Sequence, residues 1–332
     1  MTDLLSVARL AGVSRATAAR AFSEPEKVRK ATRDKVFSAS QQLGFRPNYV
    51  ARQLRTQSTC IIGVMVPTLS NPLFSEQLQA MENVARAAGY SLMVATSNYD
   101  PERELAVLEH MLRLRVDGLA LTVADARQSA SLALLEQEAL PVVLVHNPVA
   151  SAHFVTVSVD NQRAMYQATQ HLLMLGHTRI GMLAGPVQQS DRAQLRYQGY
   201  RQAMIDARCP PLPLIEMPHH TRVEEAPLRR HFGTDGELTA LLCSNDLLAL
   251  SAIGALTRLG YRVPEDISVV GFDGIELGEM VSPSLYSVVQ PTYQLGQVAT
   301  ESLLRLIGGE KVTSRTLDFI LRPGESTARA QH

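Results

Sequence analysis

Cysteine is scarce in this chain of 332 residues, and long apolar runs and an excess of either charge are missing. Its three cysteines, Cys60, Cys209 and Cys243, are odd in number and far apart. That spacing argues against a disulfide framework and a zinc site, and it favours a reducing, cytoplasmic environment. No run of about 18 apolar residues occurs, so no membrane-spanning helix is expected. The polar and basic start also lacks the apolar segment of a signal peptide.

The motifs that carry common enzyme chemistry are missing as well. The chain has no G-x-S-x-G, no phosphate-binding G-x-x-x-x-G-K, no G-x-G-x-x-G and no H-E-x-x-H. The Gly-Gly-Glu-Lys segment at 308–311 lacks the spacing and the following Ser or Thr of a phosphate loop. Missing motifs alone do not exclude an enzyme, but nothing in the chain favours one. We therefore expect a protein without catalytic residues, cofactor or metal.

The total charge is zero, but a basic segment is joined to an acidic one. Residues 1–59 contain eleven Lys and Arg against four Asp and Glu, a net charge of +7. The whole chain has 32 of each kind, so the other 273 residues carry 21 basic and 28 acidic side chains, a net charge of −7. A basic segment of this kind is typical of a DNA-binding module.

Within the basic segment, two short helices are predicted around a glycine turn. Apolar residues at Leu5, Ala8 and Leu10 indicate the first helix, and Gly12 ends it because glycine tolerates left-handed backbone. Ser14 then stands where an N-cap would begin the second helix, over 15–21. Two short helices with a Gly-containing turn form a helix-turn-helix, although such a pair also arises by packing alone.

The second predicted helix would enter the major groove of DNA. Its inner face consists of Ala18, Ala21 and Phe22. Its outer face carries the side chains expected to meet base edges and phosphates, and with the N-cap they form the predicted contact set Ser14, Arg15, Ala16, Thr17 and Arg20. A third helix is predicted over 30–43, with Val36, Phe37, Ser40 and Leu43 facing inward.

A short helix over 49–56 follows, with Asn48 as its cap. It has about two turns, and the cost of nucleation makes so short a helix marginal in water unless a partner holds it. Val50 and Leu54 lie four residues apart and therefore on one face. The segment is therefore expected to connect the basic segment to the remainder of the chain and to be helical only when a partner holds it.

The order of several motifs is similar to that of a known family. They are Val7-Ala8, Ala11-Gly-Val-Ser14, Thr17, Arg20, Val28, Thr32-Arg33, Val36, Leu43-Gly44, Pro47-Asn48, Ala51 and Leu54. This pattern resembles the lactose-repressor/galactose-repressor family of bacterial transcription regulators, and the match runs over essentially the whole chain. The chain departs from it at Ala18-Ala19, where a hydroxyl is lost, and at Arg29, where a small N-cap is usual.

The resemblance implies a homodimer, or sometimes a tetramer, that binds a palindromic operator in double-stranded DNA. It also implies that 49–56 is a hinge helix in the minor groove, with Leu54 as the wedge between base pairs. Asn48 and Tyr49 join the predicted DNA contacts. A small-molecule effector that binds the body of the protein would then release or tighten the operator.

From residue 60 onward, apolar runs alternate with helical stretches. Strands are predicted at 61–67, 91–96, 118–123, 142–146, 155–159, 179–184, 238–244 and 268–272, and helices at 74–88, 102–114, 161–175, 193–206 and 247–259. Such alternation predicts parallel, doubly wound α/β sheets, and the number of strands suits two lobes. The resemblance implies the two-lobed periplasmic-binding-protein fold, with three crossings between the lobes, near 160–161, 290–291 and 322–323.

The predicted organisation is therefore an all-α helix-turn-helix headpiece, a hinge and an α/β core. The headpiece is 1–46 and the hinge helix with its linker is 47–59. The core, 60–332, binds the effector and forms the dimer. Within it the N-lobe takes about 60–160 and 291–321, and the C-lobe about 161–290 and 322–332.

In doubly wound folds, ligands bind the loops at the carboxyl ends of the strands. Polar residues in those loops, together with matches to effector contacts of the family, give the predicted site Ser70, Asn71, Phe74, His146, Arg192, Arg196, Asp246 and Gln290. Some have simpler explanations: Asn71, Asn245 or Asp246 as helix caps, and Arg192 as a surface residue. Asp273 is expected to organise the 271–274 loop. His219 and His220 fall near an aromatic stacking position of the family, and a metal role for them is a minor alternative.

Two arginines in the cleft favour an anionic ligand, because a guanidinium matches a carboxylate or phosphate. The loop at 67–71 and the place of Arg192 are most similar to the gluconate-repressor branch of the family. We therefore expect a repressor of a sugar or sugar-acid operon, released by gluconate or a ketogluconate, while neutral sugars and nucleobases stay open. The alternatives are a corepressor-type regulator and, because the fold is shared, a transport-associated sugar-binding protein, which would need export and no basic headpiece.

Overall fold

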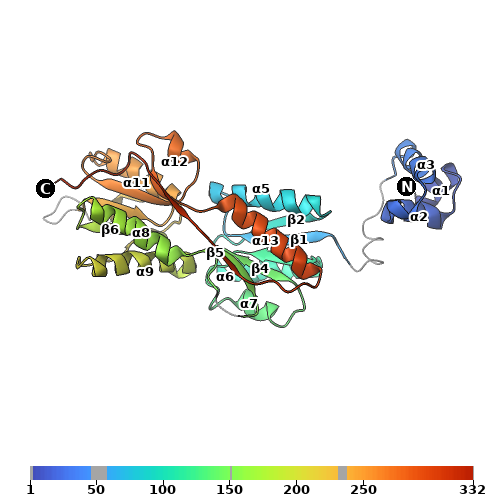
Figure 1. Ribbon diagram of the computed structural model, residues 1–332, viewed down its shortest axis with the longest axis horizontal. Helices are drawn as coiled ribbons and strands as arrows, with labels where there is room; N and C mark the ends of the chain where they lie inside the picture. Colours follow the sequence, from blue (N-terminus) through green and yellow to red (C-terminus); the bar gives the residue numbers. More distant parts are fainter. Residues whose placement is uncertain (1–2, 46–57, 150–151, 231–237, 332) are drawn as a thin grey trace. The chain divides into compact units, whose positions relative to one another are not determined.

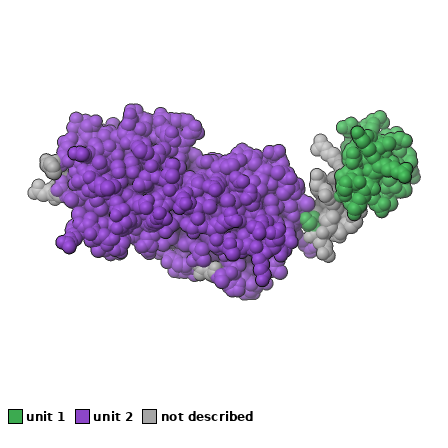
Figure 2. Space-filling view, in the orientation of Figure 1, with its two compact units in different colours: residues 1–59 green, residues 60–332 purple. Residues whose placement is uncertain are grey.

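The structure, a computed structural model, describes residues 3–45, 58–149, 152–230 and 238–331. The chain divides into two compact units, residues 1–59 and 60–332, which are coloured separately in Figure 2. Within the described ranges, no helix is both long and apolar enough to cross a membrane. The predicted hinge helix at 49–56, with Asn48, Tyr49 and Leu54, lies outside the described residues.

The described residues of the first unit form three α-helices and one 3₁₀ turn: α1 (Leu4–Leu10), α2 (Arg15–Ser23), η1 (Pro25–Lys27) and α3 (Lys30–Gln42). Gly12 has φ +66°, which gives the turn between α1 and α2 the left-handed backbone that favours glycine. The core is small and made of short side chains: Val7, Ala8, Ala18, Ala21, Val36 and Ala39. Arg29 at the N-cap of α3 makes no side-chain capping bond, so this helix starts without the support that the other two have.

Three apolar residues of this unit are partly exposed: Leu5 and Leu10, which indicated the first helix, and Phe37, which was predicted to face inward. Leu5 and Leu10 are 41% and 52% exposed, and Val7 and Ala8 take the buried face of α1. A helix of two turns has a narrow contact stripe, so only one side of each turn reaches the core. Phe37 is 39% exposed and packs at the rim, with its ring centroid 5.5 Å from that of Phe22.

The second unit contains two six-stranded sheets, one in each lobe (Figure 1). The N-lobe sheet is parallel throughout and has the order β11-β5-β4-β3-β1-β2. Its strands are β1 (Ile61–Val66), β2 (Ser91–Thr96), β3 (Gly118–Leu121), β4 (Val142–Val145), β5 (Val155–Val159) and β11 (Arg315–Leu317). One face is covered by α5 (Pro72–Ala87) and α13 (Thr292–Ile307), and the other by α6 (Pro101–Arg113) and α7 (Ala130–Leu135).

The C-lobe sheet has the order β12-β10-β9-β8-β6-β7. Its strands are β6 (Ile180–Ala184), β7 (Ile215–Glu216), β8 (Ala240–Cys243), β9 (Ser268–Asp273), β10 (Tyr286–Val289) and β12 (Ile320–Arg322), of which only β12 pairs antiparallel among the described strands. Its helical elements are α8 (Asn161–Met174), η2 (Val187–Gln189), α9 (Asp191–Asp206), α10 (Glu225–Arg229), α11 (Asp246–Arg258) and α12 (Leu277–Met280). The predicted fold class is confirmed.

The chain passes between the sheets after β5, after β10 and between β11 and β12. The first two passages lie at the predicted positions. The third was predicted near 322–323, which is too late, because Ile320–Arg322 already pairs with β10 in the C-lobe sheet. This strand has three residues and Ile320 is 65% exposed, so it lacks the buried apolar run that reveals the other strands.

Candidate functional site

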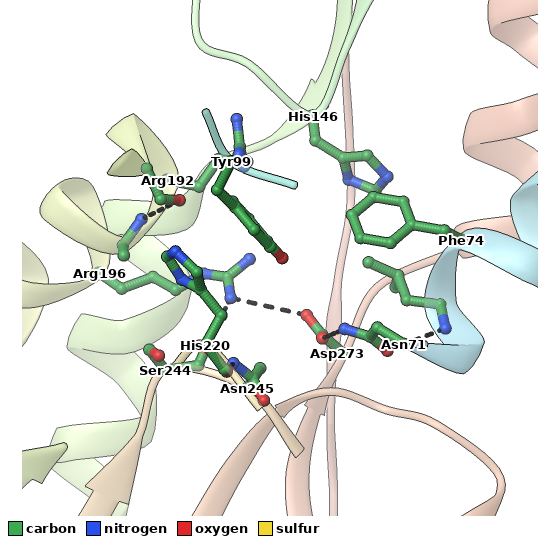
Figure 3. A pocket seen from close by; sticks show the side chains of 13 residues that line it. Asn71, Phe74, Tyr99, His146, Arg192, Arg196, His220, Ser244, Asn245 and Asp273 are labelled. Carbon is green, nitrogen blue, oxygen red and sulfur yellow. Dashed lines mark hydrogen bonds and ion pairs between the residues drawn. The ribbon is translucent and has the colours of Figure 1, made fainter. Parts of the chain in front are cut away.

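The carboxyl ends of the two sheets meet at a polar cavity between the lobes (Figure 3). Its volume is about 40 Å³, which is room for about three water molecules. The N-lobe contributes Asn71, Leu73, Phe74, Tyr99 and His146 to its lining. The C-lobe contributes Ser190, Arg192, Ala193, Arg196, His220, Ser244, Asn245 and Asp273. The structure thus brings together five of the eight predicted effector residues: Asn71, Phe74, His146, Arg192 and Arg196.

Asp273 links the two lobes from the end of β9. Its Oδ2 accepts a hydrogen bond of 3.0 Å from Nδ2 of Asn71, and its Oδ1 accepts one of 2.9 Å from Nε2 of Gln290. Burial raises the pKa of this carboxyl, and the nearby guanidinium of Arg196 acts in the opposite direction. Asp273 thus does more than organise the 271–274 loop, since it lines the cavity and its carboxylate accepts a hydrogen bond from a side chain of the other lobe.

Four contacts hold the side chain of Arg196 in place. Its Nε donates to Oδ1 of Asn161 at 2.8 Å, and its Nη1 donates to the carbonyl of Ser244 and lies 3.6 Å from Oδ1 of Asp273. The guanidinium carbon lies 3.6 Å from the ring centroid of Phe272, in cation–π geometry. Burial lowers the pKa of Arg196 to about 10, so this side chain stays charged at neutral pH.

Arg192 is buried at the cavity wall. Its Nη1 donates to the carbonyl of Val123 at 2.7 Å and lies 3.0 Å from Oδ1 of Asp191. Its Nη2 is buried and has no hydrogen-bond partner among the residues that the structure describes. The alternative of a solvated surface residue is therefore excluded, and a cationic donor is left for another group.

His146 follows β4 with a left-handed backbone, φ +68°. Its Nε2 lies 2.7 Å from Oε1 of Gln77, and its ring meets that of Phe74 edge to face at 5.9 Å between centroids. Burial lowers the pKa of His146 to about 3, and Arg192 and Arg196 add to this effect. The imidazole is thus neutral at physiological pH.

Tyr99 and His220 form a stacked pair in the wall of the cavity. Tyr99 was not among the predicted site residues. Their ring centroids are 3.7 Å apart, with 22° between the planes, and each ring comes from a different lobe (Figure 3). Burial lowers the pKa of His220 to about 4, so it is neutral too. Tyr99 stands in the loop after β2, where the rule applied to other strands would have found it. No group of three or more His, Cys, Asp or Glu suited to a metal ion occurs within the described ranges.

Three predicted residues lie away from the cavity lining. Ser70 is exposed on the loop before α5. Gln290 is buried and reaches the site through Asp273. Asp246 needs a correction, because its carboxylate is turned into the C-lobe, where it accepts hydrogen bonds from Oγ of Ser287 at 2.6 Å and from the backbone N–H of Ile275 at 2.8 Å. Asp273 presents the carboxylate to the cavity in its place.

The predicted recognition helix is α2. Ser14 caps it by accepting a hydrogen bond of 3.1 Å from the backbone N–H of Thr17. Ala18 and Ala21 are fully buried on the inner face, which leaves Arg15, Ala16 and Arg20 exposed and Thr17 half-buried on the outer face. An exposed first turn that carries a guanidinium and a methyl group is suited to reading base edges.

Comparison with known proteins identifies the family. Residues 3–48 match the bacterial regulatory proteins of the lacI family, and residues 169–327 match a periplasmic binding protein-like domain. The HTH-type transcriptional regulator GntR of Escherichia coli strain K12 is 34% identical over 326 residues, which covers 97% of this chain and 98% of GntR. The chain belongs to the lacI family.

Two further relatives of this lacI-family member cover nearly its whole length. The HTH-type transcriptional repressor PurR of Aliivibrio salmonicida is 30% identical over 334 residues and is covered to 99%. The crystal structure of the lac repressor dimer bound to operator and the anti-inducer ONPF superimposes with a TM-score of 0.87 at 28% identity, covering 98% of this chain and 99% of the repressor chain. The protein is a DNA-binding transcription regulator and not an enzyme.

Proposed function

We propose that this lacI-family regulator represses an operon for sugar-acid catabolism, and that the acid is the effector that releases the operator. The proposal rests on Arg192, which lines the cleft and whose buried Nη2 has no hydrogen-bond partner in the described part of the chain. A buried, unpaired cationic donor costs free energy, and a carboxylate is the group that satisfies it best.

The charges around the cavity support an anionic ligand. The described lining includes two guanidiniums, Arg192 and Arg196, and one carboxylate, Asp273. His146 and His220 are neutral at pH 7 because burial lowers both pKa values. The groups that line the cleft therefore carry a net positive charge, and the Asp191 carboxylate behind them pairs with Nη1 of Arg192, which leaves Nη2 as the donor for a ligand carboxylate.

The remaining polar groups suit a polyol chain. The Asp273 carboxylate and the amides of Asn71 and Asn245 offer acceptors and donors for hydroxyl groups. Phe74 offers an apolar face beside them. A sugar acid combines the carboxylate and the hydroxyls in one molecule, and the resemblance to the gluconate-repressor branch agrees with this class.

Binding an effector of that size requires movement, because the cavity holds only about three water molecules. In the proposed mechanism, an effector hydroxyl replaces the Asn71 amide at Asp273 and resets the distance between the lobes. The shift of the N-lobes then lowers the affinity of a homodimer for a palindromic operator. By linkage, operator must weaken effector binding by the same factor.

Calorimetric titration of the full chain with gluconate, 2-ketogluconate, glucose, ribose and hypoxanthine tests the effector class. We expect one of the acids to bind most tightly. Arg192→Gln should weaken that acid about 10- to 100-fold, the size of a lost hydrogen bond to a charged group. Arg113→Gln is the matched control, because Arg113 is an exposed arginine of the N-lobe that pairs with Glu109 on its own helix and does not line the cleft.

A neutral ligand that binds more tightly than either acid, or an Arg192→Gln protein that binds acids like the wild type, would contradict the effector class. The sign of regulation is tested separately, by titrating operator DNA with and without the bound acid. Weaker operator binding supports release, whereas tighter binding would make the protein a corepressor-type regulator.

A further inference from the structure

The described lining of the cleft contains four aromatic rings, and they pack against one another in two pairs (Figure 3). Phe74 and His146, both from the N-lobe, meet edge to face with 5.9 Å between their ring centroids. Tyr99 of the N-lobe stacks on His220 of the C-lobe, with 3.7 Å between the centroids and 22° between the planes. Proteins commonly hold a flat or ring-shaped ligand by packing it on an aromatic face. In this cleft, the protein's own rings cover faces that such a ligand would use.

The C-lobe holds the imidazole of His220 in its place. Its Nε2 lies 3.2 Å from Oε1 of Gln189, and its backbone carbonyl accepts a hydrogen bond of 2.7 Å from Nδ2 of Asn245. Gly185, directly after β6, lies against the same residue, because a Cβ added there would be 2.8 Å from Nδ1 of His220. The imidazole therefore has little room to turn away from Tyr99.

The backbone of the loop after β2 holds the ring of Tyr99 in the same way. Asn98 and Tyr99 both have left-handed backbone, with φ +54° and +60°, which is uncommon for residues other than glycine. The loop is anchored on both sides: the N–H of Asn98 donates to the carbonyl of Pro67 at 2.8 Å, and Asp100 caps α6 by accepting from the N–H of Glu102 at 2.9 Å. Backbone of this kind, held in place beside a ligand cleft, indicates a function for the side chain that it positions.

The hydroxyl of Tyr99 is available to a ligand. Burial raises the pKa of Tyr99 to about 12, so the hydroxyl keeps its proton at neutral pH and can donate a hydrogen bond. Figure 3 shows it pointing toward the space between Arg196 and Asp273. One side chain thus covers the face of an aromatic ring and offers a polar group to the cavity.

This arrangement distinguishes ligands by shape. A six-membered ring would have to separate Tyr99 from His220, at the loss of an aromatic pair that corresponds to about 2- to 12-fold in affinity. An open-chain polyol is narrower, and it can place its hydroxyls on Asn71 and Asp273 without parting the two rings. The small volume of the cavity, about 40 Å³, favours the narrower ligand as well.

We propose that Tyr99 sets the shape specificity of the cleft: it covers His220 against ring-shaped ligands, and the cleft takes an open-chain polyhydroxy acid. The inference rests on the proposed function, because it assumes that the ligand carboxylate binds Arg192 in the same cleft. It adds the form of the acid, which the charge of the lining does not decide. Arg192 selects the effector by charge, and Tyr99 selects it by shape.

Calorimetric titration of the full chain with four ligands separates shape from charge. Gluconate is an open-chain acid, and glucuronate is an acid of the same charge that forms a six-membered ring in water. Sorbitol and glucose are neutral ligands of the same two shapes. We expect wild type to bind gluconate at least about fivefold more tightly than glucuronate, the size of a lost aromatic pair.

Two variants of Tyr99 assign this preference to its ring. Tyr99→Asn removes the ring, and asparagine tolerates left-handed backbone, so the loop should keep its shape and the preference for gluconate should fall below about twofold. Tyr99→Phe keeps the ring and loses the hydroxyl, so both acids should weaken alike and the preference should stay. Tyr293→Asn is the matched control, because Tyr293 is an exposed tyrosine that does not line the cleft.

Equal affinity of wild type for gluconate and glucuronate overturns the inference, and so does a Tyr99→Asn protein that keeps the wild-type ratio. The proposed acid effector fails separately: if sorbitol binds as tightly as gluconate, and both bind more tightly than the ring forms, the selection by shape stands and the selection by charge is wrong. No saturable binding of any of the four ligands overturns both.

Discussion

Asn71 of the N-lobe donates a hydrogen bond to Asp273 of the C-lobe, with 3.0 Å between Nδ2 and Oδ2. Both residues are buried, and 202 positions separate them in the sequence. The same Asn71 side chain caps α5 by accepting from the backbone N–H of Leu73 at 3.1 Å. One amide thus starts a helix with its oxygen and joins the lobes with its nitrogen.

Asn71→Asp separates these two roles. Aspartate caps a helix as well as asparagine does, so α5 should keep its stability. The amide donor becomes a second carboxylate facing Asp273, and like charges at this distance repel. We expect a larger radius of gyration by small-angle scattering and effector affinity reduced at least about tenfold, or about 1.4 kcal/mol. Ser70→Ala, one residue earlier but exposed, should change neither.

The buried carboxyl of Glu104 should make the free energy of unfolding depend on pH. Burial raises the pKa of this carboxyl to about 7, from an ordinary value of 4.5, although it accepts a hydrogen bond of 2.6 Å from the backbone N–H of Ala124. The folded state therefore holds the proton more tightly than the unfolded chain. Its contribution is fully present below about pH 4.5 and is lost as the pH rises through about 7.

Unfolding by urea at pH 5, 6, 7 and 8 measures this dependence. Relative to Glu104→Gln, wild type should lose stability as the pH rises over that range, by at most about 1.4 kcal/mol per pH unit for one group, because His146, His220 and Asp246 titrate alike in both proteins. Glu104→Gln keeps an acceptor for Ala124 but cannot titrate, so its stability should fall less than that of wild type and should be higher at pH 8. Glu102→Gln, exposed on the same helix, should follow the wild-type profile; a similar flattening there would contradict the assignment to Glu104.

Removal of the Arg20 side chain should change the salt dependence of DNA binding. It is exposed on α2, one turn beyond Arg15. If it contacts a phosphate, Arg20→Ala weakens binding to every sequence and lowers the slope of log affinity against log salt by about 0.9. Fluorescence anisotropy with operator and random DNA at several salt concentrations measures both. Arg229→Ala removes an equal charge from the C-lobe and should leave the slope unchanged; a loss confined to one base position would instead make Arg20 a base contact.

Gly199 sets how closely α8 and α9 pack. A Cβ added there would lie 2.1 Å from the backbone oxygen of Gln162, so the two helices would have to separate. We expect Gly199→Ala to lower the free energy of unfolding by about 1–3 kcal/mol or more. Gly254→Ala on α11 meets only the flexible end of Arg258 at 3.4 Å, and helix propensity should make it neutral or stabilising by up to about 1 kcal/mol. Thermal unfolding of both variants checks the contrast.

Most strands buried on both faces were predictable because they are continuous apolar runs, but the buried strand β10, in which Ser287 interrupts the run, was not predicted. β1, β4 and β5 lie within one residue of their predicted bounds, and the same signal revealed the central strand β8. The edge strands β7, β11 and β12 were not predicted. Each has two or three residues, and the neighbouring strand, rather than a local apolar pattern, makes it a strand.

The residues of the cleft also divide into those that the sequence predicted and those that it did not. Asn71 and His146 were found because the carboxyl ends of parallel strands meet at one edge of a sheet, whereas Arg196, within α9, was found because its spacing to Gly199 matches the family. Asp246 and Asp273 both follow strands of the C-lobe, and the sequence favoured the wrong one. Asp273 faces the cavity with φ +120°, whereas Asp246 is held by Ser287 and Ile275.

Apolar periodicity, glycine turns and the separation of charge are local properties, so the sequence by itself determined a basic helix-turn-helix unit and an α/β body with two sheets. The direction of a buried side chain depends on partners that are distant in the chain. Only the tertiary structure decided that Asp273 joins the lobes, that Tyr99 stacks on His220, and that Arg192 keeps a polar atom without a partner in the described ranges.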